Sequence, residues 1–171
     1  MKIHAQSSAA LTQLGKLVEA IPVAMLCNLD SEGALVSRPM SPLEMDVNGA
    51  LWFFIDVNSS KVEQLRKVNL SFADPARASY VSLAGYGELE TDPAHIKQLW
   101  SPFMKPWFPE GPDSANLALL KFVPESAEYW DAPHSKMVRM VAMAASVVAG
   151  KAVGLGDHDT LTGLTPKLRG G

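Results

Sequence analysis

The chain has 171 residues, of which 47% are hydrophobic, and its formal net charge at pH 7 is −3. This length can bury one substantial core, and the weakly acidic balance lacks the basic patch of a nucleic-acid-binding surface, so we expect one main domain without a nucleic-acid partner. A single cysteine, Cys27, excludes a disulfide framework or a thiolate metal cluster within one chain.

The N-terminal residues and the apolar segments bear on the cellular compartment. Residues 1–8 lack the apolar core of a secretory signal. No apolar run reaches the ~20 residues that cross a bilayer, so we expect a cytoplasmic protein without a membrane partner. The four histidines are isolated along the sequence, and this spacing predicts no metal site.

An amphipathic helix is predicted over residues 8–20, where Ser8 can cap the start and Pro22 follows the end. The apolar residues of this segment recur at helical spacing: Leu11, Leu14, Leu17, Val18 and Ile21. Short β patterns follow, and Asn48-Gly49 is a strong signal for a two-residue hairpin. The predicted strands of this part cover residues 23–29, 34–42, 43–47 and 50–55.

Consecutive antiparallel hairpins would place the strand that carries Arg38 beside the strand over residues 50–55. The remaining strands are predicted over residues 69–73, 80–90, 117–123 and 126–130. Gly85 and Gly87 interrupt one of them and indicate a bulge or the close approach of another backbone. Thr91 or Asp92 is expected to cap a further helix.

These elements predict a mainly β (α+β) protein with about six or seven antiparallel strands and helices between them. Closure into a small barrel would remove the exposed strand edges. We therefore expect a six- or seven-stranded antiparallel barrel with flanking helices over residues 1–145. Residues 146–171 are expected to form a partly flexible C-terminal extension.

The turn after the strand over residues 50–55 has the pattern of an anion site. Ser60 and Glu63 have the spacing of a capping box, which would open a short helix. The backbone N–H groups at a helix start, together with the Lys61 ammonium, can hold a phosphate. The alternative is an ordinary helix start with a solvated lysine, and these residues alone do not exclude it.

Five motifs occur in order along the chain: Ser37-Arg38-Pro39-Met40-Ser41, the segment over residues 51–65, Gly85-Tyr86-Gly87-Glu88-Leu89, Trp107-Phe108-Pro109-Glu110-Gly111 and Glu128-Tyr129-Trp130-Asp131. This ordered set resembles the flavin-binding split-barrel family related to pyridoxamine 5'-phosphate oxidase. The resemblance is strongest to the bacterial general-stress-protein branch of that family. It extends from about Leu14 to Asp131 and implies a split β-barrel.

The resemblance implies flavin mononucleotide (FMN) in a cleft between the two subunits of a homodimer. Arg38 matches the family arginine that reaches the FMN phosphate, and the backbone of Pro39, Met40 and Ser41 would lie against the isoalloxazine ring. A guanidinium and an ammonium supply the charge-assisted donors that a phosphate dianion needs.

The resemblance also implies flavin contacts at the end of the strand over residues 50–55 and in the aromatic loop. Phe54, Ile55 and Asp56 match the strand end that passes the ribityl chain and phosphate, while Ser59, Ser60 and Lys61 match the turn that closes over the phosphate. Trp107 is our candidate for the ring edge or for a lid from the neighbouring subunit. Trp130 fits core packing at least as well, and Trp52 and Trp100 are assigned to the core or to a dimer contact.

The resemblance leaves the reaction open. A flavin redox step would make the chain a general stress protein with FMN-dependent oxidoreductase activity on an unknown substrate, and no catalytic residue is identifiable. The alternative is a non-catalytic flavin carrier or sensor. Residues 164–171 do not reproduce the C-terminal arginines and basic-proline motif of authentic pyridoxamine 5'-phosphate oxidases, which disfavours that activity. Flavin adenine dinucleotide (FAD) would fit an open cleft, and the sequence does not exclude a deazaflavin.

Overall fold

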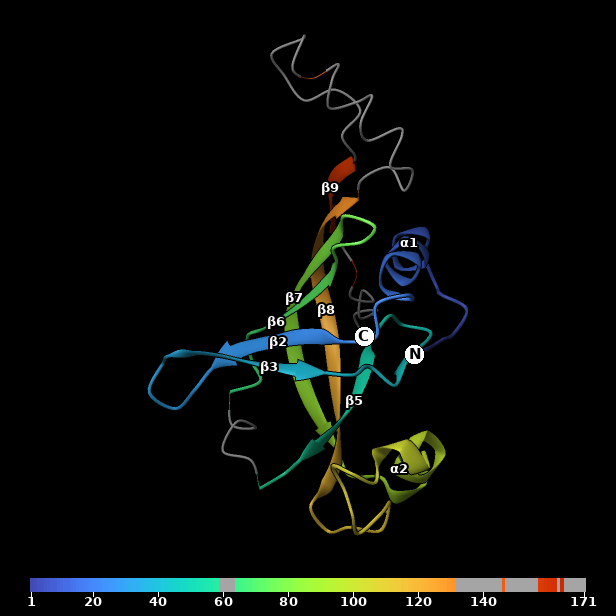
Figure 1. Cartoon of the computed structure of the whole chain (residues 1–171), viewed down its shortest axis with the longest axis vertical. Helices are drawn as coiled ribbons and strands as arrows, with labels where there is room; N and C mark the ends of the chain where they lie inside the picture. The colour runs from blue at the N-terminus through green and yellow to red at the C-terminus, as the bar shows by residue number, and fades with distance from the viewer. Residues whose placement is uncertain (59–63, 132–145, 147–156, 163, 165–171) are drawn as a thin grey trace, which may run out of the picture.

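The computed structural model describes residues 1–58, 64–131, 146, 157–162 and 164. In this part of the chain, nine strands form one sheet in the order β1-β4-β5-β8-β7-β6-β2-β3, and β9 pairs with β8. The strands are β1 (Lys2–Ile3), β2 (Ala24–Leu29), β3 (Leu35–Met40), β4 (Glu44–Met45), β5 (Leu51–Asp56), β6 (Val68–Asp74), β7 (Ser79–Glu90), β8 (Leu117–Asp131) and β9 (Asp157–Thr162). Figure 1 shows β7 and β8 as the long central strands, with β2 and β3 running across them at a large angle.

Two α-helices and a short 3₁₀ helix flank the sheet. They are α1 (Ala9–Val18), α2 (Pro93–Leu99) and η1 (Pro102–Met104). The side chain of Ser8 caps α1 by accepting the N–H of Leu11 at 3.2 Å, which confirms the predicted helix and its cap. Asp92, one of the two predicted caps, accepts the N–H of Ala94 at the start of α2.

A hairpin turn forms at the predicted Asn48-Gly49, but its loop has three residues instead of two. The N–H of Asp46 donates to the carbonyl oxygen of Ala50 at 2.9 Å, and the N–H of Gly49 donates to that of Asp46 at 3.0 Å, so Val47 belongs to the loop as well. Gly49 adopts a φ of +85°, a left-handed conformation that favours glycine. The Asp46 carboxylate accepts the N–H groups of Asn48 at 2.9 Å and Ala50 at 3.0 Å, which fixes the turn between β4 and β5.

The sheet differs from the prediction in three respects. It is mixed, because β1 pairs in parallel with β4, and the described residues contain nine strands instead of six or seven. Two of the strands were not predicted: β1 precedes the first helix and β9 follows Asp131. The strand predicted over residues 43–47 is present as the two-residue β4, and the two predicted final strands form the single 15-residue strand β8.

The expectation that β3 lies beside β5 is wrong. β3 pairs with β2 at one end of the sheet order, whereas β5 lies between β4 and β8. The reason is that β2 pairs with the more distant β6, so the hairpin of β2 and β3 joins the sheet next to β6.

The predicted irregularity at Gly85 is confirmed, because the register between β7 and β8 shifts between Ala84 and Gly85. A Cβ atom on Gly85 would lie 2.1 Å from the carbonyl oxygen of Val123, so only glycine lets the two strands approach this closely. The bulge changes the course of the longest strand pair in the molecule.

β5 is buried on both faces, which explains its almost continuous apolar sequence. Leu51, Phe53 and Ile55 belong to the main core, which also includes the buried face of α1. Trp52 and Phe54 point the other way and join a second cluster with Ile96 of α2 and with Leu117 and Leu119 of β8. This second cluster places the segment after α2 next to the end of β5.

The predicted domain boundary at residues 145/146 stays a prediction. β9 lies within the predicted extension and pairs with β8 from Ser126 to Asp131. Leu164 also belongs to the main core. Most of the residues from 132 to 171, including the predicted flexible end, lie outside the described part.

Candidate functional site

A pocket of about 350 Å³ lies between the end of β3, the second core cluster and the segment after α2. Its volume falls within the range of about 300–1,000 Å³ for small-molecule sites. Five of the predicted site residues line it: Pro39, Met40, Ser41, Phe54 and Trp107. The remaining lining residues are Val23, Leu43, Met104 and Phe108, so none of the described residues in the walls has a charged side chain.

The aromatic wall of the pocket is held by ring contacts. The ring centroids of Phe54 and Phe108 are 6.0 Å apart at an interplanar angle of 65°, and those of Phe54 and Trp100 are 5.7 Å apart. Edge-on contacts of this kind fix the position of aromatic rings. Trp107 instead remains 72% exposed at the pocket, so its indole is open to a ligand or a partner.

Chain segments from distant parts of the sheet form this pocket. β3 and β5 are five steps apart in the sheet order, which would separate them by about 24 Å in a flat sheet with ~4.8 Å between strands. Residues of both strands nevertheless line one pocket. The sheet must therefore curl strongly between its ends.

Arg38 is half-buried on β3, two residues before Met40. It lies opposite Leu26 of β2, which is fully buried, so its side chain leaves the backbone on the core face. Burial lowers the pKa of the Arg38 guanidinium through desolvation. A guanidinium nevertheless stays protonated in proteins, so Arg38 is a partly desolvated cation on the face that it shares with Met40, about 7 Å along the strand.

The predicted site residues at the end of β5 point to different faces of the strand. Phe54 lines the pocket, whereas the Ile55 side chain is 6% exposed and packs in the main core, so the structure does not bring it into the pocket. Asp56 is exposed, and its carboxylate accepts the N–H of Asn58 at 2.9 Å. Ser59, Ser60 and Lys61 lie outside the described residues, and their predicted contact with a phosphate stays a prediction.

Sequence reasoning missed four of the nine residues that line the pocket. Phe108 was noted as part of the aromatic loop, but Val23, Leu43 and Met104 are single apolar residues with no local signal of their own. Met104 lies in η1, close after Trp100, and the density of aromatic residues from Trp100 to Phe108 was the one available indication.

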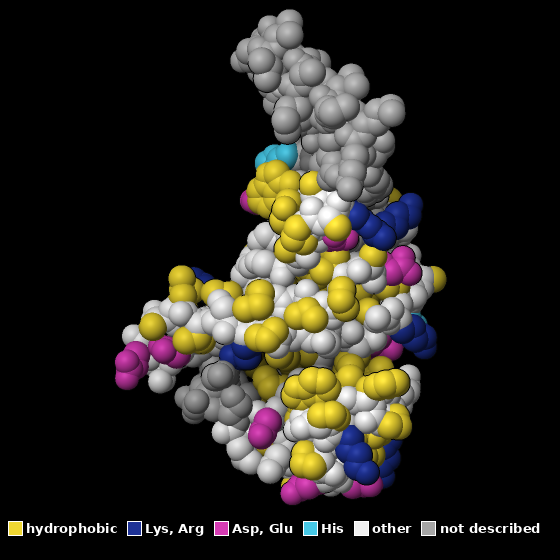
Figure 2. Space-filling view, in the orientation of Figure 1, with side chains coloured by type: hydrophobic (Ala, Val, Ile, Leu, Met, Phe, Trp, Pro, Cys, Tyr) yellow, Lys and Arg dark blue, Asp and Glu magenta, His cyan; other side chains and the backbone are white. Residues whose placement is uncertain are grey.

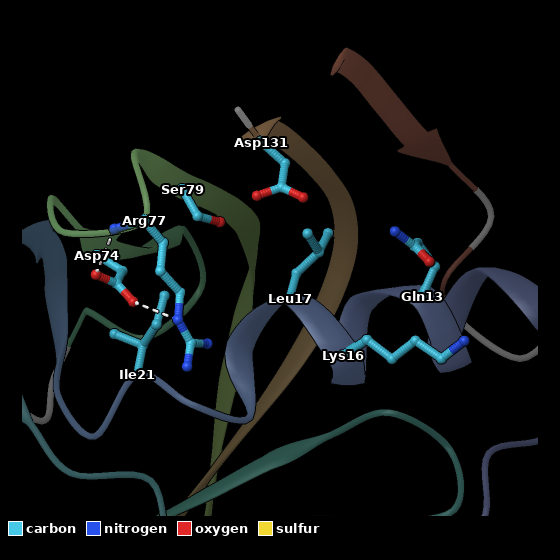
Figure 3. Close-up of a pocket in the computed structure, with 8 residues that line it drawn as sticks. All are labelled: Gln13, Lys16, Leu17, Ile21, Asp74, Arg77, Ser79 and Asp131. Atoms are coloured by element: carbon cyan, nitrogen blue, oxygen red, sulfur yellow. Dashed lines mark hydrogen bonds and ion pairs between the residues drawn. The ribbon is translucent and has the colours of Figure 1, made fainter. Parts of the chain in front are cut away.

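A second, smaller pocket of about 160 Å³ is polar and lies between α1, the turn from β6 to β7 and the end of β8 (Figure 3). Arg77 points into it and pairs with Asp74, with 3.5 Å between Nε and Oδ2. Lys16, Ser79 and Asp131 also line this pocket. None of the predicted site residues that the structure describes lines this pocket, and the chain continues from Asp131 outside the described part.

The described part of the chain contains no group of three or more histidine, cysteine, aspartate or glutamate side chains arranged to hold a metal ion. None of the helices in this part has the length and apolar character of a bilayer-crossing segment.

The model of a protein family described as "Pyridoxamine 5'-phosphate oxidase like" matches residues 9–154. The chain belongs to this family. A relative among characterised proteins is the Protein bli-3 of Neurospora crassa, which is 22% identical over 154 residues, with 82% of this chain and 74% of the relative covered.

Solved structures agree with the membership in the pyridoxamine 5'-phosphate oxidase like family. A general stress protein 26 from Jannaschia sp. CCS1 superposes with a TM-score of 0.71 at 26% identity, covering 91% of this chain and 99% of that protein. The general stress FMN/FAD binding protein from Xanthomonas citri superposes with a TM-score of 0.61 at 27% identity, covering 74% of this chain and 91% of that protein. The general-stress resemblance found in the sequence is thus confirmed at the level of family and neighbours.

Proposed function

We propose that this chain is a flavin-binding general stress protein that holds FMN and works as a flavin-dependent oxidoreductase. One observation carries the proposal: the apolar pocket between β3 and β5 is lined by five residues that the sequence had assigned to the flavin. The name of the Xanthomonas citri neighbour, an FMN/FAD binding protein, supports flavin as the ligand class. FAD remains the alternative form of the cofactor.

The residues present fit the two halves of FMN. The uncharged pocket suits the isoalloxazine ring, with Phe54 and Phe108 on one wall and the end of β3 on another. Arg38 has a partly desolvated guanidinium on the same strand, and a charge-assisted hydrogen bond strengthens as water is excluded. Lys61, with Ser59 and Ser60, is proposed from the sequence to complete the phosphate contact.

We further propose a six- or seven-stranded split barrel as the core of the sheet, and a homodimer in the cytoplasm with the flavin at the subunit interface. The strong curl between β3 and β5 supports the barrel. Exposed apolar side chains near the pocket and on the outer sheet face support the dimer: Val23, Met25, Tyr80, Trp107 and Trp130 are each 42–72% exposed. Figure 2 shows hydrophobic side chains gathered across β2 and β3 and over the lobe around α2.

The bound flavin would supply hydride or electron transfer. The residues of this chain would bind and orient it: the pocket walls exclude water from the ring, and Arg38 fixes the phosphate end. Turnover separates this proposal from its alternative, a flavin carrier or sensor. Reduction of the bound flavin by NADH or NADPH supports the oxidoreductase, whereas saturable binding without reduction or reoxidation supports the carrier. Formation of pyridoxal 5'-phosphate would instead identify a true pyridoxamine 5'-phosphate oxidase.

A titration of the purified apoprotein by flavin fluorescence quenching tests the binding, with FMN and riboflavin compared. We expect one site per subunit and a clear preference for FMN. Arg38→Ala should weaken FMN by about tenfold or more, because a hydrogen bond to a charged group contributes about 1.5–3 kcal/mol, and should change riboflavin much less.

Arg77→Ala is the matched control for this substitution, because Arg77 is exposed, pairs with Asp74 and lies outside the apolar pocket. It should leave both affinities unchanged. Equal losses for FMN and riboflavin in Arg38→Ala would contradict the assignment of Arg38 to the phosphate.

A further inference from the structure

A third pocket, which we call the adjoining pocket, lies beside the apolar pocket, between β1, the segment over residues 42–44 and the end of α2. Its volume is about 340 Å³, within the range of small-molecule sites. It shares Leu43 and Met104 with the apolar pocket, and its lining includes charges of both signs. The other lining residues are Lys2, Pro42, Glu44, Gln98, Leu99 and Ser101.

The sheet places the two charged residues of the adjoining pocket side by side. β1 pairs in parallel with β4, with Lys2 opposite Glu44, so the two side chains leave the sheet on the same face. The N–H of Lys2 donates to the carbonyl oxygen of Leu43 at 3.0 Å, which fixes this register. The Glu44 side chain is directed towards α2, because its Oε1 lies 3.6 Å from Nε2 of His95 on that helix.

The Glu44 carboxylate is held in one orientation and can still accept a hydrogen bond. It is 5% exposed, and a buried carboxylate is costly unless it is paired or hydrogen-bonded. Its Oε2 lies 3.0 Å from Nε2 of His4, and His95 is itself held by a contact of its Nδ1 with Glu90. Each carboxylate oxygen has two lone pairs, so Glu44 can accept from a ligand as well.

Hydrogen-bond donors lie across the pocket from this acceptor. Within the described part of the chain, no ion pair joins the exposed Lys2 ammonium to Glu44 or to another carboxylate. Gln98 adds an amide, and Ser101 adds a hydroxyl whose oxygen accepts the N–H of Phe103 at 3.2 Å and whose O–H can donate. An ammonium with neighbouring amide and hydroxyl groups suits the carboxylate of a ligand.

We propose that the adjoining pocket binds a small aliphatic amino acid, a molecule that carries a carboxylate, a protonated amine and an apolar side chain. The carboxylate of the ligand binds the Lys2 ammonium, and its amine donates to Glu44. Its side chain packs against the apolar part of the lining, which Pro42, Leu43 and Leu99 form. Neither charged contact involves a residue assigned to the flavin, so the inference goes beyond the proposed function.

Isothermal titration calorimetry tests this inference with three ligands of similar shape, on the purified protein with and without saturating FMN. The ligands are racemic leucine, isocaproate, which lacks the amine, and isoamylamine, which lacks the carboxylate. Leucine should bind about tenfold more tightly than either analogue, because each analogue loses one charge-assisted contact.

Two substitutions assign the contacts. Lys2→Gln should weaken leucine by about tenfold and change isoamylamine by less than about twofold. Glu44→Gln, which keeps the shape of the side chain, should weaken leucine and isoamylamine by about tenfold and leave isocaproate within about twofold. Lys97→Gln is the matched control, because Lys97 also lies on α2 but pairs with Asp113 at 2.7 Å and does not line the pocket. It should leave all three affinities unchanged.

The outcomes separate this inference from the proposed function, because flavin binding is measured in its own titrations. If racemic leucine does not bind at concentrations up to about 10 mM, the inference is overturned whether or not FMN binds. Leucine binding that Lys2→Gln and Lys97→Gln leave equally strong would also overturn it. The comparison of ligands on the wild type and on Lys2→Gln keeps the test decisive if Glu44→Gln does not fold.

Discussion

Substitution of Trp107 should weaken flavin binding without changing the stability of the protein. Its side chain is 72% exposed in the free protein, yet it lines the apolar pocket. An indole presents at most about 250 Å², so about 180 Å² is open on Trp107, and covering half of it with a ring is worth about 2 kcal/mol at ~25 cal/mol per Å². Trp107→Ala should therefore weaken flavin binding about 30-fold.

The assay is the fluorescence-quenching titration with FMN and riboflavin, together with urea unfolding of the free protein. Because the substitution acts on the ring, both ligands should lose affinity by the same factor. The free energy of unfolding should change by less than about 0.5 kcal/mol, as for surface substitutions in general. This pattern differs from that of Arg38→Ala, which should weaken FMN much more than riboflavin.

Phe103→Ala is the matched control, because Phe103 is 84% exposed in the neighbouring η1 helix but does not line the pocket. It should leave both dissociation constants within about twofold, the scale of a weak surface contribution. If Trp107→Ala behaved like Phe103→Ala, the assignment of Trp107 to the ring would be refuted.

Two further predictions concern stability, and urea unfolding measures both. Gly85→Ala should destabilise the protein by about 1–3 kcal/mol or more, because its Cβ would lie 2.1 Å from the Val123 carbonyl oxygen. Gly15→Ala in α1 should instead stabilise the protein by up to about 1 kcal/mol, because a Cβ there has no neighbour nearer than 3.4 Å and alanine favours the helix. If both substitutions changed the free energy of unfolding in the same direction, the packing account would be contradicted. Glu44→Ala should lower the free energy of unfolding by about 1–3 kcal/mol, because the Glu44 carboxylate is 5% exposed and lies 3.0 Å from the His4 ring and 3.6 Å from the His95 ring. A change below about 0.5 kcal/mol would show that the pairing with these histidines contributes little to stability.

Local features of the fold were predictable from the sequence. The cap at Ser8, the turn at Asn48-Gly49 and the bulge at Gly85 each follow from the stereochemistry of a few neighbouring residues. The order of the strands was not predictable in this way. The pairing of β2 with β6 spans some forty residues, and a hairpin pattern carries no information on such distant partners.

In the candidate site, too, some features were predictable from the sequence and others were not. The motif from Pro39 to Ser41 and the aromatic residues Phe54 and Trp107 were found because a family pattern marks them, and the structure brings them to one pocket. Ile55 was grouped with Phe54, although alternation along a strand puts neighbouring side chains on opposite faces. Because β5 is apolar on both faces, its sequence alone could not tell which face meets the ligand.

A crystal structure of the protein with FMN tests the central claim most directly. The account predicts the isoalloxazine ring in the pocket between the end of β3 and Phe54, in contact with the backbone of Pro39 to Ser41, and the phosphate within hydrogen-bond distance of Arg38. A ring bound elsewhere, for instance in the polar pocket beside Arg77, would contradict it.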